Sequence, residues 1–533
     1  MSSKSTSPTT FDVVIIGGAL AGAATAIQLL DARPGLRVLV IERSEAFDRR
    51  VGEATVELST YFLNRVLGLA DHLNEHHLVK QGLRFWFANG RTTGLDRCSE
   101  IGGRYQVRLS AYLIDRAVLD EEVLRRAVKR GATLWRPAVL KRHQLKSGGP
   151  QELEIAHHGE TTRVQCRWLV DASGVHALLA RKEGWHRPNL AHPTTAAWAR
   201  WRGVKNWDSE ELAAKFPAWA TATFSLRNTA TNHLMGDGWW AWWIPLKGGD
   251  VSIGVVWDHR RVDVPDGASI ADRIKSFLCA QHPAARELMS EARPVEGDSH
   301  WRRQLAWSPT TSAGDGFVLV GDAAGFMDPF YSPGLDWLAF TTARAVQLIS
   351  AQQTGEPQLE ALVQKHNRDF ARSYGRWFEA LYRDKYDYLG DFELMRLSFL
   401  PDLGLYYLGI VTQPYYRGRE ALLEPCFTPA PSTPFFHYMR LYNRRLAAIA
   451  RSRRARGTFG RRNTDRRFLF KGFNLQPGSV MPILVAFLGW MRLELAEGWR
   501  TWFSSSPTAV MAGPSITPDA SRPASSPMSM EAR

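Results

Sequence analysis

The sequence is short of cysteine and of long apolar runs, and each shortage excludes a class of protein. Its 533 residues hold four scattered cysteines, with no CxxC pair, at Cys98, Cys166, Cys279 and Cys426. We therefore expect no disulfide framework, no metal site, and a reducing, cytoplasmic compartment. The apolar stretch 480–491 is too short to cross a bilayer, so no transmembrane segment is predicted. Residues 1–10 lack an apolar signal segment.

Charge and composition mark the two ends of the chain. The residues 1–10 are Ser/Thr-rich and 504–533 are Ser/Pro/Ala/Met-rich, so both are predicted to be disordered. The net charge of +14 is concentrated in arginines between 440 and 467. A solvated arginine-rich helix and loop is the plainer interpretation, and an acidic membrane or carrier protein is the alternative. No nucleic-acid motif accompanies the charge, so nucleic acid is not an expected partner.

The residues 11–42 have the pattern of a dinucleotide-binding unit. An apolar strand, a glycine turn, a helix and a second strand follow one another, and the second strand ends in Glu42. Gly17, Ala19 and Gly22 form the turn, with Ala19 at the place of the usual middle glycine. This arrangement predicts that a pyrophosphate lies on the helix N-terminus and that Glu42 binds the adenosine ribose.

A second glycine turn lies at Gly321-Asp322, after the apolar run 317–320. An aspartate at this position can accept a hydrogen bond from a ribityl hydroxyl. A helix is predicted over 335–350, and its N-terminal amides favour negative charge close to that turn. The segment 169–174 reads as another strand and turn that returns to the nucleotide sheet.

These turns resemble those of flavin monooxygenases of the hydroxybenzoate-hydroxylase type. Within that superfamily, two motifs resemble the flavin-dependent halogenases. The residues 240–245, WAWWIP, match their W-x-W-x-I-P pattern, and 326–334, FMDPFYSPG, match their F-x-x-P-x-x-S-x-G pattern. The GEAT segment at 52–55 also resembles theirs. The resemblance runs from about residue 11 to about residue 350.

The fold class that follows is α/β: an FAD-binding Rossmann-like domain of the glutathione-reductase type, interrupted by a β-sheet substrate domain and followed by a helical C-terminal region. Strands are expected at 198–204, 220–226, 239–245 and 251–257, and C-terminal helices at 370–408 and 483–502. The expected division is 11–185 for the FAD-binding domain with inserted segments, 186–310 for the substrate domain, 311–350 for the return to the FAD domain, and 351–503 for the helical region.

The resemblance implies a cofactor and a reaction. FAD, supplied as FADH2 by a separate flavin reductase, would react with oxygen and chloride or bromide to give hypohalous acid. No second nucleotide fingerprint for NADPH is visible. The residues implied to contact FAD are Gly17, Ala19, Gly22, Glu42, Arg43, Ala54, Thr55, Arg116, Asp322 and Gly325. Halide contacts are implied for Ser332, Gly334 and Leu335, where Pro333 cannot donate an amide.

Three further residues carry the implied catalysis. Lys80, in the strand-like run 79–87, stands where the family lysine that passes the halogen to the substrate is expected. Burial would lower its pKa and suit that role; an ordinary surface lysine is the alternative. Trp240 and Trp242 have the period-2 spacing of one strand face. In the family such tryptophans keep the substrate away from the flavin. The alternative is that they are ordinary aromatic residues of the core with no role in the reaction.

The substrate is expected to be an electron-rich aromatic, of phenol or pyrrole type, free or tethered to an acyl or peptidyl carrier protein. Tyr331 stands where the tryptophan-halogenating branch has a glutamate, which argues against free tryptophan. A phenol would need a base, which no sequence pattern identifies. Two other interpretations remain: an aromatic monooxygenase or geranylgeranyl-reductase-like oxidoreductase of the same fold, and a non-enzymatic flavin-binding or carrier-docking protein.

Overall fold

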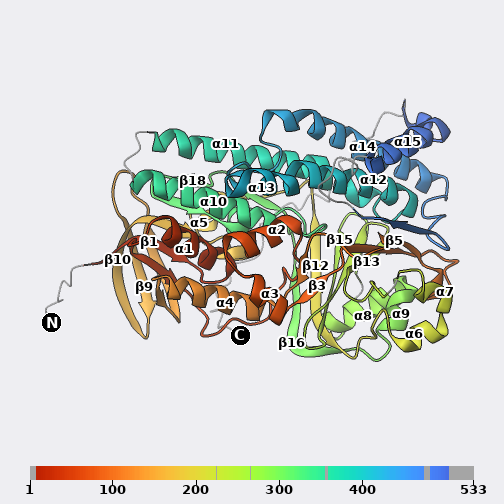
Figure 1. Ribbon diagram of the computed structural model, residues 1–533, viewed down its shortest axis with the longest axis horizontal. Helices are drawn as coiled ribbons and strands as arrows, with labels where there is room; N and C mark the ends of the chain where they lie inside the picture. Colours follow the sequence, from red (N-terminus) through yellow and green to blue (C-terminus); the bar gives the residue numbers. More distant parts are fainter. Residues whose placement is uncertain (1–7, 224, 265, 354–357, 473–480, 503–533) are drawn as a thin grey trace, which may run out of the picture.

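The computed structural model describes residues 8–223, 225–264, 266–353, 358–472 and 481–502. Two stretches predicted to be disordered, 1–10 and 504–533, lie outside these ranges except at residues 8–10. There the prediction is wrong, because strand β1 (Thr9–Ile16) already begins at Thr9. Figure 1 shows one sheet with its helices on the left, a second sheet on the right, and a layer of C-terminal helices across both.

The first sheet is built around β1, which pairs in parallel with β10 (Glu160–Asp171) and β2 (Val38–Ile41). The order is β18-β19-β10-β1-β2-β7, and β8 and β9 extend it beside β10. The four residues Val13–Ile16 are buried, as expected for a parallel strand covered on both faces. The remaining strands are β7 (Thr133–Trp135), β8 (Ala138–Gln144), β9 (Gln151–His157), β18 (Ala313–Gly314) and β19 (Phe317–Leu319).

Helices α1 (Leu20–Ala32), α4 (Arg116–Lys129) and α10 (Gly334–Gln353) cover this sheet, with α1 packed between the other two. The alanine-rich side of α1 is fully buried, which allows close packing. The helix expected at 335–350 is thus confirmed. Smaller helices connect these elements: α2 (Glu57–Tyr61), the π-helix η1 (Phe62–Val66), α3 (Ala70–His76), the 3-10 turns η2 (Leu95–Arg97) and η3 (Gly174–His176), and α5 (Leu178–Lys182).

The second sheet has the order β16-β12-β15-β14-β13-β4-β5-β20. The strands expected at 198–204, 239–245 and 251–257 are present as β12 (Thr194–Arg202), β14 (Trp239–Pro245) and β15 (Val251–Asp258). Strands from other parts of the chain join them, so the sheet is not made from 186–310 alone. The strands from outside that range are β4 (Leu83–Phe87), β5 (Ser99–Gly103) and β20 (Arg467–Phe470). Strands β13 (Thr231–Gly236) and β16 (Arg293–Arg302) lie within it and complete the sheet.

The strand predicted at 220–226 is wrong. Helix α7 (Pro217–Ala220) ends there and the chain continues in turns, because Pro217 at the first helical position starts a helix and not a strand. With α6 (Glu210–Lys215), α8 (Ile270–Gln281) and α9 (Pro283–Leu288), it lies beside the second sheet (Figure 1). Two-stranded sheets are formed by β3 (Leu78–Lys80) with β6 (Ala111–Leu113) and by β11 (His186–Pro188) with β17 (Trp307–Pro309).

The run 79–87, expected as one strand, is two. Lys80 ends β3, whereas Phe85 lies in β4 of the second sheet. Gly82 adopts φ +75° between them, a left-handed conformation that breaks an extended strand. The break leaves Lys80 in the two-stranded sheet of β3 and β6, where it pairs with Ala111, and not in the second sheet that contains Phe85.

The single helix expected at 370–408 is also interrupted. Helix α11 (Leu359–Trp377) passes into the π-helix η5 (Phe378–Tyr382), and α12 (Phe392–Tyr406) starts afresh at Asp391, whose side chain caps it. The further helical elements are η6 (Lys385–Asp387), η7 (Tyr407–Val411), α13 (Thr412–Arg417), η8 (Gly418–Leu423), η9 (Ala430–Ser432), α14 (Thr433–Ala455), α15 (Met481–Ala496) and η11 (Gly498–Thr501).

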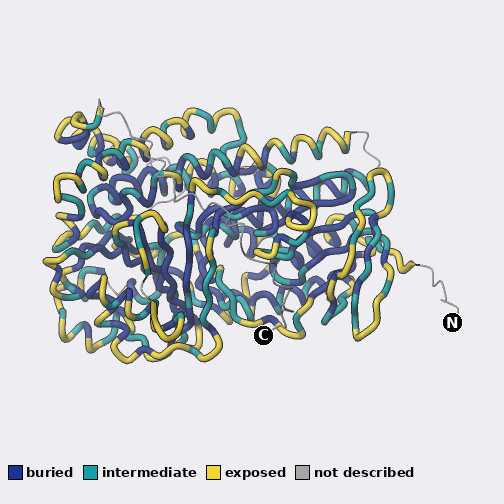
Figure 2. Tube along the Cα trace, turned by 180° about the vertical axis from the view of Figure 1, so that it is seen from behind, coloured by how far each residue is buried: buried dark blue, intermediate teal, exposed yellow. Residues whose placement is uncertain are grey.

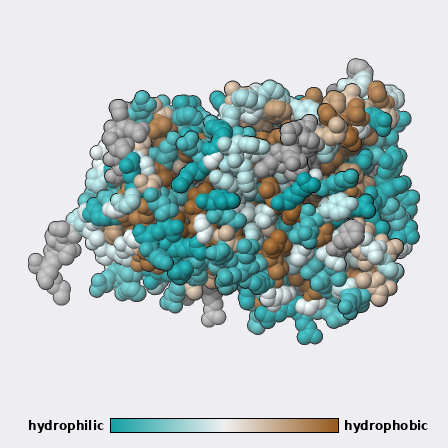
Figure 3. Space-filling view, in the orientation of Figure 1, coloured by the Kyte–Doolittle hydropathy of each residue, from teal (hydrophilic) through white to brown (hydrophobic). Residues whose placement is uncertain are grey.

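The C-terminal layer bears on the question of membranes. The stretch Phe392–Leu423 is long and apolar enough to cross a bilayer, but 67% of its most apolar window is buried inside the protein, as in a core helix. Figure 2 shows the buried trace running through the junction of helices and sheets. Figure 3 shows apolar side chains around α15, whose outward residues include Leu484, Val485 and Leu488.

Most arginines of the segment 440–467 make ion pairs within the protein. Arg453 is buried and pairs with Asp391, Glu393 and Glu497. Further pairs join Arg440 to Glu379, Arg445 to Glu494, Arg451 to Asp387, Arg454 to Asp237, Arg456 to Glu497 and Arg462 to Glu393. Much of the positive charge seen in the sequence therefore ties α14 to its neighbours.

Candidate functional site

The glycine turn after β1 has the shape that a pyrophosphate needs. Gly17 has φ +97°, and a Cβ there would lie 2.6 Å from the carbonyl oxygen of Ala172. A Cβ on Gly22 would lie 1.9 Å from the carbonyl oxygen of Gly17. Ala19 is the N-cap residue of α1, and its side chain makes no hydrogen bond to the helix. The backbone amides of the first turn are therefore available to bind an anion. The turn fits the dinucleotide site that the sequence predicts.

Glu42 lies at the end of β2, beside this turn. Its Oε2 accepts a hydrogen bond from the Gly18 amide at 2.8 Å, and its Oε1 accepts from the Ser44 amide at 3.0 Å. The carboxylate is thus held where an adenosine ribose would pass. Arg43 is exposed, with Nη2 3.0 Å from Nε2 of His176, so it lies at the rim of the turn.

Arg116 and Asp322 come together from distant parts of the chain. Arg116 pairs with Asp120 through two contacts of 3.1 Å and lies against Gly52, where a Cβ would be 2.7 Å from its Nη1. Burial raises the pKa of Asp322, while the charges of Arg302 and Arg116 act to lower it. Gly325 has φ +127° just after this turn. Arg116 thus lies against the 52–55 segment and interacts with the charge of Asp322, so three segments distant in the sequence are close in space, as a site for a flavin ribityl chain would require.

Lys80 is buried, with its side chain 1% exposed. Its Nζ donates a hydrogen bond to the carbonyl oxygen of Thr55 at 2.7 Å. Burial lowers the pKa of this amine to about 8, although the charges of Glu57 and Asp336 act to raise it. No carboxylate of the described residues lies within ion-pair distance of Nζ. The lysine is therefore a desolvated amine, as the sequence predicts, and not a surface lysine.

Lys80 lies on the wall of a chamber of about 1120 Å³, counted to its open mouth. The chamber is walled by the 331–336 loop, the start of α2, η5 and α12. Its inner lining includes Val56, Glu57, Tyr331, Pro333, Asp336, Tyr382, Phe399, Asp402, Tyr406 and Tyr407, and Phe470 and Lys471 also line it. It is mostly apolar with a few polar groups, which suits an aromatic molecule.

The loop before α10 holds the predicted halide residues. Tyr331 and Ser332 adopt φ +70° and +58°, so the backbone turns sharply into the helix. The Ser332 amide already donates to the carbonyl oxygen of Pro329 at 2.9 Å, so only its hydroxyl remains for a halide. The amides of Gly334 and Leu335 begin the helix and have no acceptor within it. They are the better placed donors.

Trp240 and Trp242 share one face of β14, as their spacing predicts. Trp240 donates from Nε1 to the Tyr386 hydroxyl at 2.8 Å and packs against Phe330, with ring centroids 5.1 Å apart. Trp242 donates to the Ser252 hydroxyl at 3.2 Å. Both are buried and neither lines the Lys80 chamber. Their contacts support the loop that contains Phe330 from behind.

Sequence reasoning missed two groups of residues. Asp328 connects the loop to its surroundings: its Oδ2 accepts from the Tyr386 hydroxyl at 2.9 Å and lies 2.7 Å from Nε2 of His192. Asp336 lies in the chamber, where Tyr406 donates to it at 3.0 Å. The position of Asp336 directly after the motif was the one available signal. The partners of both aspartates come from residues with no recognisable motif.

None of the residues that line the chamber is a histidine. His233 stacks on Phe85, and burial lowers its pKa to about 3. Burial likewise lowers the pKa of His77 to about 4. Both are neutral at physiological pH. Among the described residues no group of His, Cys, Asp and Glu has an arrangement able to hold a metal ion.

Comparison with known proteins agrees with this geometry. A family model described as FAD binding domain matches residues 10–337. The flavin-dependent halogenase chlA of Dictyostelium discoideum is 27% identical over 478 residues, covering 82% of this chain and 76% of that protein. The tryptophan 2-halogenase of Chondromyces crocatus is 23% identical over 373 residues, covering 69% and 67%.

Among solved structures, the halogenase PltM in complex with phloroglucinol and FAD has a TM-score of 0.71 at 17% identity, with 90% of this chain and 96% of that chain covered. This similarity shows a shared fold across both sheets and the helical layer. The expected resemblance to flavin-dependent halogenases is confirmed, FAD is the cofactor that the matched family binds, and the chain belongs to the FAD binding domain family.

Proposed function

We propose that this enzyme uses FADH2, oxygen and a halide to make hypohalous acid, and that Lys80 passes the halogen to an electron-rich aromatic substrate. The observation that carries the proposal is the Lys80 amine itself. The amine is buried and has no ion pair with a carboxylate of the described residues. It donates a hydrogen bond to Thr55, in the segment expected to approach the isoalloxazine, and it lines the chamber. Bound FAD would supply the oxygen chemistry that oxidises the halide.

The residues of the chain then have separate roles. The α1 turn and Glu42 hold the nucleotide, and the amides of Gly334 and Leu335 hold the halide at the start of α10. Below pH 8 the Lys80 ammonium donates a hydrogen bond to hypohalous acid and polarises its O–X bond. Trp240 and Trp242 fix the loop that separates substrate from flavin.

A phenol is the substrate class that the chamber favours. Its lining combines aromatic rings with hydroxyl and carboxyl groups, as an aromatic alcohol requires. The PltM structure with phloroglucinol, a phenol, has the same fold. In this proposal the substrate is either free or attached to a carrier protein, and a separate flavin reductase supplies FADH2. The thiols of all four cysteines are free, in keeping with a reducing, cytoplasmic location.

The test is a halide-dependence assay. Purified protein, FAD, a flavin reductase, NADH, oxygen and bromide are mixed with a panel of phenols, pyrroles and indoles, and products are identified by mass spectrometry. The proposal predicts brominated product that requires bromide. Hydroxylated product without a halide requirement would instead identify an aromatic monooxygenase. NADPH oxidation by the protein alone would identify a self-sufficient oxidoreductase.

A further inference from the structure

Asp336 is a buried carboxyl group, and one of its two oxygens has no hydrogen-bond partner in the described chain. It lies in the first turn of α10, directly after the halide loop, and is 1% exposed. Its Oδ2 accepts a hydrogen bond from the Tyr406 hydroxyl at 3.0 Å. Its Oδ1 is buried and has no hydrogen-bond partner within the described parts of the chain, and Asp336 forms no ion pair there. A buried polar atom without a partner costs the fold free energy, so this one calls for an explanation.

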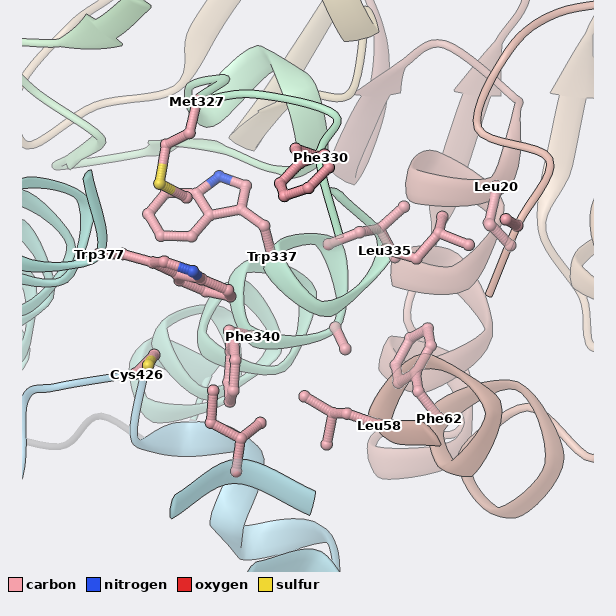
Figure 4. Packing of buried hydrophobic residues seen from close by; sticks show 14 of the residues in the cluster. Leu20, Leu58, Phe62, Met327, Phe330, Leu335, Trp337, Phe340, Trp377 and Cys426 are labelled. Atoms are coloured by element: carbon pink, nitrogen blue, oxygen red, sulfur yellow. The ribbon is translucent and has the colours of Figure 1, made fainter. Parts of the chain in front are cut away.

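The surroundings of Asp336 explain why it is not simply a helix-stabilising acid. Figure 4 shows the two residues that flank Asp336 in an apolar environment: Trp337 packs against Met327, Phe330 and Trp377, and Leu335 lies between Phe330 and Leu20. Burial raises the pKa of Asp336 to about 8, although the nearby polar groups of Tyr406 and Ser59 act to lower it. The titratable groups that act on it or feel its charge are Lys80 on β3, Glu57 on α2, Tyr382 on η5, Tyr406 on α12, and Cys426.

The other two acids of the chamber are already engaged. Asp402 Oδ2 pairs with Lys385 at 2.7 Å and accepts from Ser398 at 2.8 Å and from Tyr331 at 3.2 Å. Glu57 is half-buried and accepts from the Tyr407 hydroxyl at 2.7 Å. Oδ1 of Asp402 likewise has no hydrogen-bond partner in the described chain, but Asp402 has Lys385 as its countercharge. Asp336 is therefore the acid lining the chamber that combines full burial with no ion pair. It lines the same chamber as Lys80.

We propose that Asp336 is the general base that accepts the proton of a phenolic substrate, so that the chamber is built for a phenol and not for a ring lacking a hydroxyl. This rests on the proposed halogenase function. Tyr406, bound to Oδ2, orients the carboxylate. A base is needed because a phenolate ring is far more nucleophilic than the neutral phenol.

The step balances as follows. The phenol O–H bond breaks, the proton goes to the Asp336 carboxylate, and the electron pair moves from oxygen into the ring as a ring carbon bonds to the halogen of hypohalous acid. The O–X bond breaks, and the departing hydroxide takes a proton from the Lys80 ammonium to form water. The neutral Lys80 amine then takes the proton from the halogenated carbon. The restored phenolate recovers its proton from Asp336.

The test compares two substrates in an isosteric variant. Asp336→Asn is assayed with phloroglucinol and with N-methylpyrrole, which has no acidic proton. For phloroglucinol we expect kcat/KM to fall about 10²–10⁴-fold, the usual range for loss of a general base. For N-methylpyrrole we expect kcat/KM to fall less than about 10-fold, because no hydroxyl proton has to be removed. A series of fluorinated phenols gives a second readout, since the more acidic phenols ionise without help and should recover activity in the variant.

The outcomes separate the base from the enzyme activity as a whole. Equal losses for phloroglucinol and N-methylpyrrole, or no recovery with acidic phenols, would overturn the role of Asp336. Absence of bromination by the wild type with every substrate would reject the proposed function instead. Thermal melting and FAD binding of Asp336→Asn show whether the variant is folded. Tyr406→Phe, which keeps the carboxyl but removes its orienting donor, is expected to reduce phloroglucinol turnover by a smaller factor.

Discussion

Two buried charged regions of this molecule follow opposite rules. In the second sheet, Glu100 is held between Arg84 at 2.6 Å and Arg227 at 2.9 Å, and all three side chains are fully buried. In the chamber, Lys80 and Asp336 are just as deeply buried but have no ion-pair partner in the described chain. Charge that is compensated holds a fold together, whereas uncompensated charge is retained at a cost to stability. Such a cost is expected at a functional site, and it supports the proposed role of the chamber.

The same contrast appears in the pKa directions. Burial alone would raise the pKa of Glu100, but Arg227 and Arg84 outweigh it and lower the pKa. For Asp336 and Lys80 burial dominates, so both pKa values move toward neutrality. A carboxyl and an amine that titrate near pH 8 can exchange protons during turnover, which a firmly ionised pair cannot.

The largest expected effect is on activity when the chamber amine is removed. Lys80→Met should lower kcat/KM for bromination by at least about 10³-fold, since the group that delivers the halogen is lost. The same variant should be roughly 1–3 kcal/mol more stable at pH 7, because a buried amine with a depressed pKa costs the folded state free energy. Urea unfolding and product analysis measure the two effects. Retained activity, or marked destabilisation, would remove the distinction between the regions.

The matched change in the paired region should do the reverse. Glu100→Gln leaves Arg84 and Arg227 buried without a countercharge and should lower the free energy of unfolding by about 3–5 kcal/mol. Bromination per folded molecule should change little, since Glu100 does not line the chamber. Urea unfolding with activity normalised to bound FAD tests this. A stable but inactive variant would show that the triad acts in the reaction.

The dependence on pH should sharpen the comparison. For phenols, kcat/KM should rise as Asp336 loses its proton near pH 8 and fall as Lys80 loses its own, giving a narrow maximum there. Asp336→Asn should lose the acidic limb. Glu100 affects stability and not activity. Folding lowers the pKa of Glu100, so its contribution to the free energy of unfolding is fully present above the pKa of the unfolded chain and is lost as pH falls through the pKa of the folded protein. A flat activity profile between pH 6 and 10 would contradict the chamber assignments.

The smallest effect is expected where Trp240 meets the loop. Tyr386→Phe removes the hydroxyl that joins Trp240 to Asp328 and should cost about 1 kcal/mol of stability. Slight loosening of the loop should raise the share of hypobromous acid that escapes into solution. Thermal melting and a halogen trap measure the two. No change in either would indicate that the tryptophans are ordinary core residues.

Local sequence pattern predicted the first sheet well, because the buried runs 13–16 and 168–170 are apolar and glycine-containing turns follow them. It failed where long-range pairing decides. Strand β20 pairs with β5 from more than 360 residues away, and no local pattern in Arg467–Phe470 predicts this pairing. Lys80 could be predicted only through the family resemblance. Asp336 could not, since an acid in the first turn of a helix normally interacts with the helix dipole, and only tertiary structure shows it buried beside the lysine.

The most direct measurement of the central claim separates formation of hypohalous acid from its use. Wild type and Lys80→Ala, each with a flavin reductase, FAD, NADH, oxygen and bromide, are given a phenol substrate and a small diketone trap for escaped hypobromous acid. The account predicts that the wild type brominates the phenol, whereas Lys80→Ala brominates the trap and leaves the phenol unchanged. Bromination of the phenol by Lys80→Ala at the wild-type rate would contradict it.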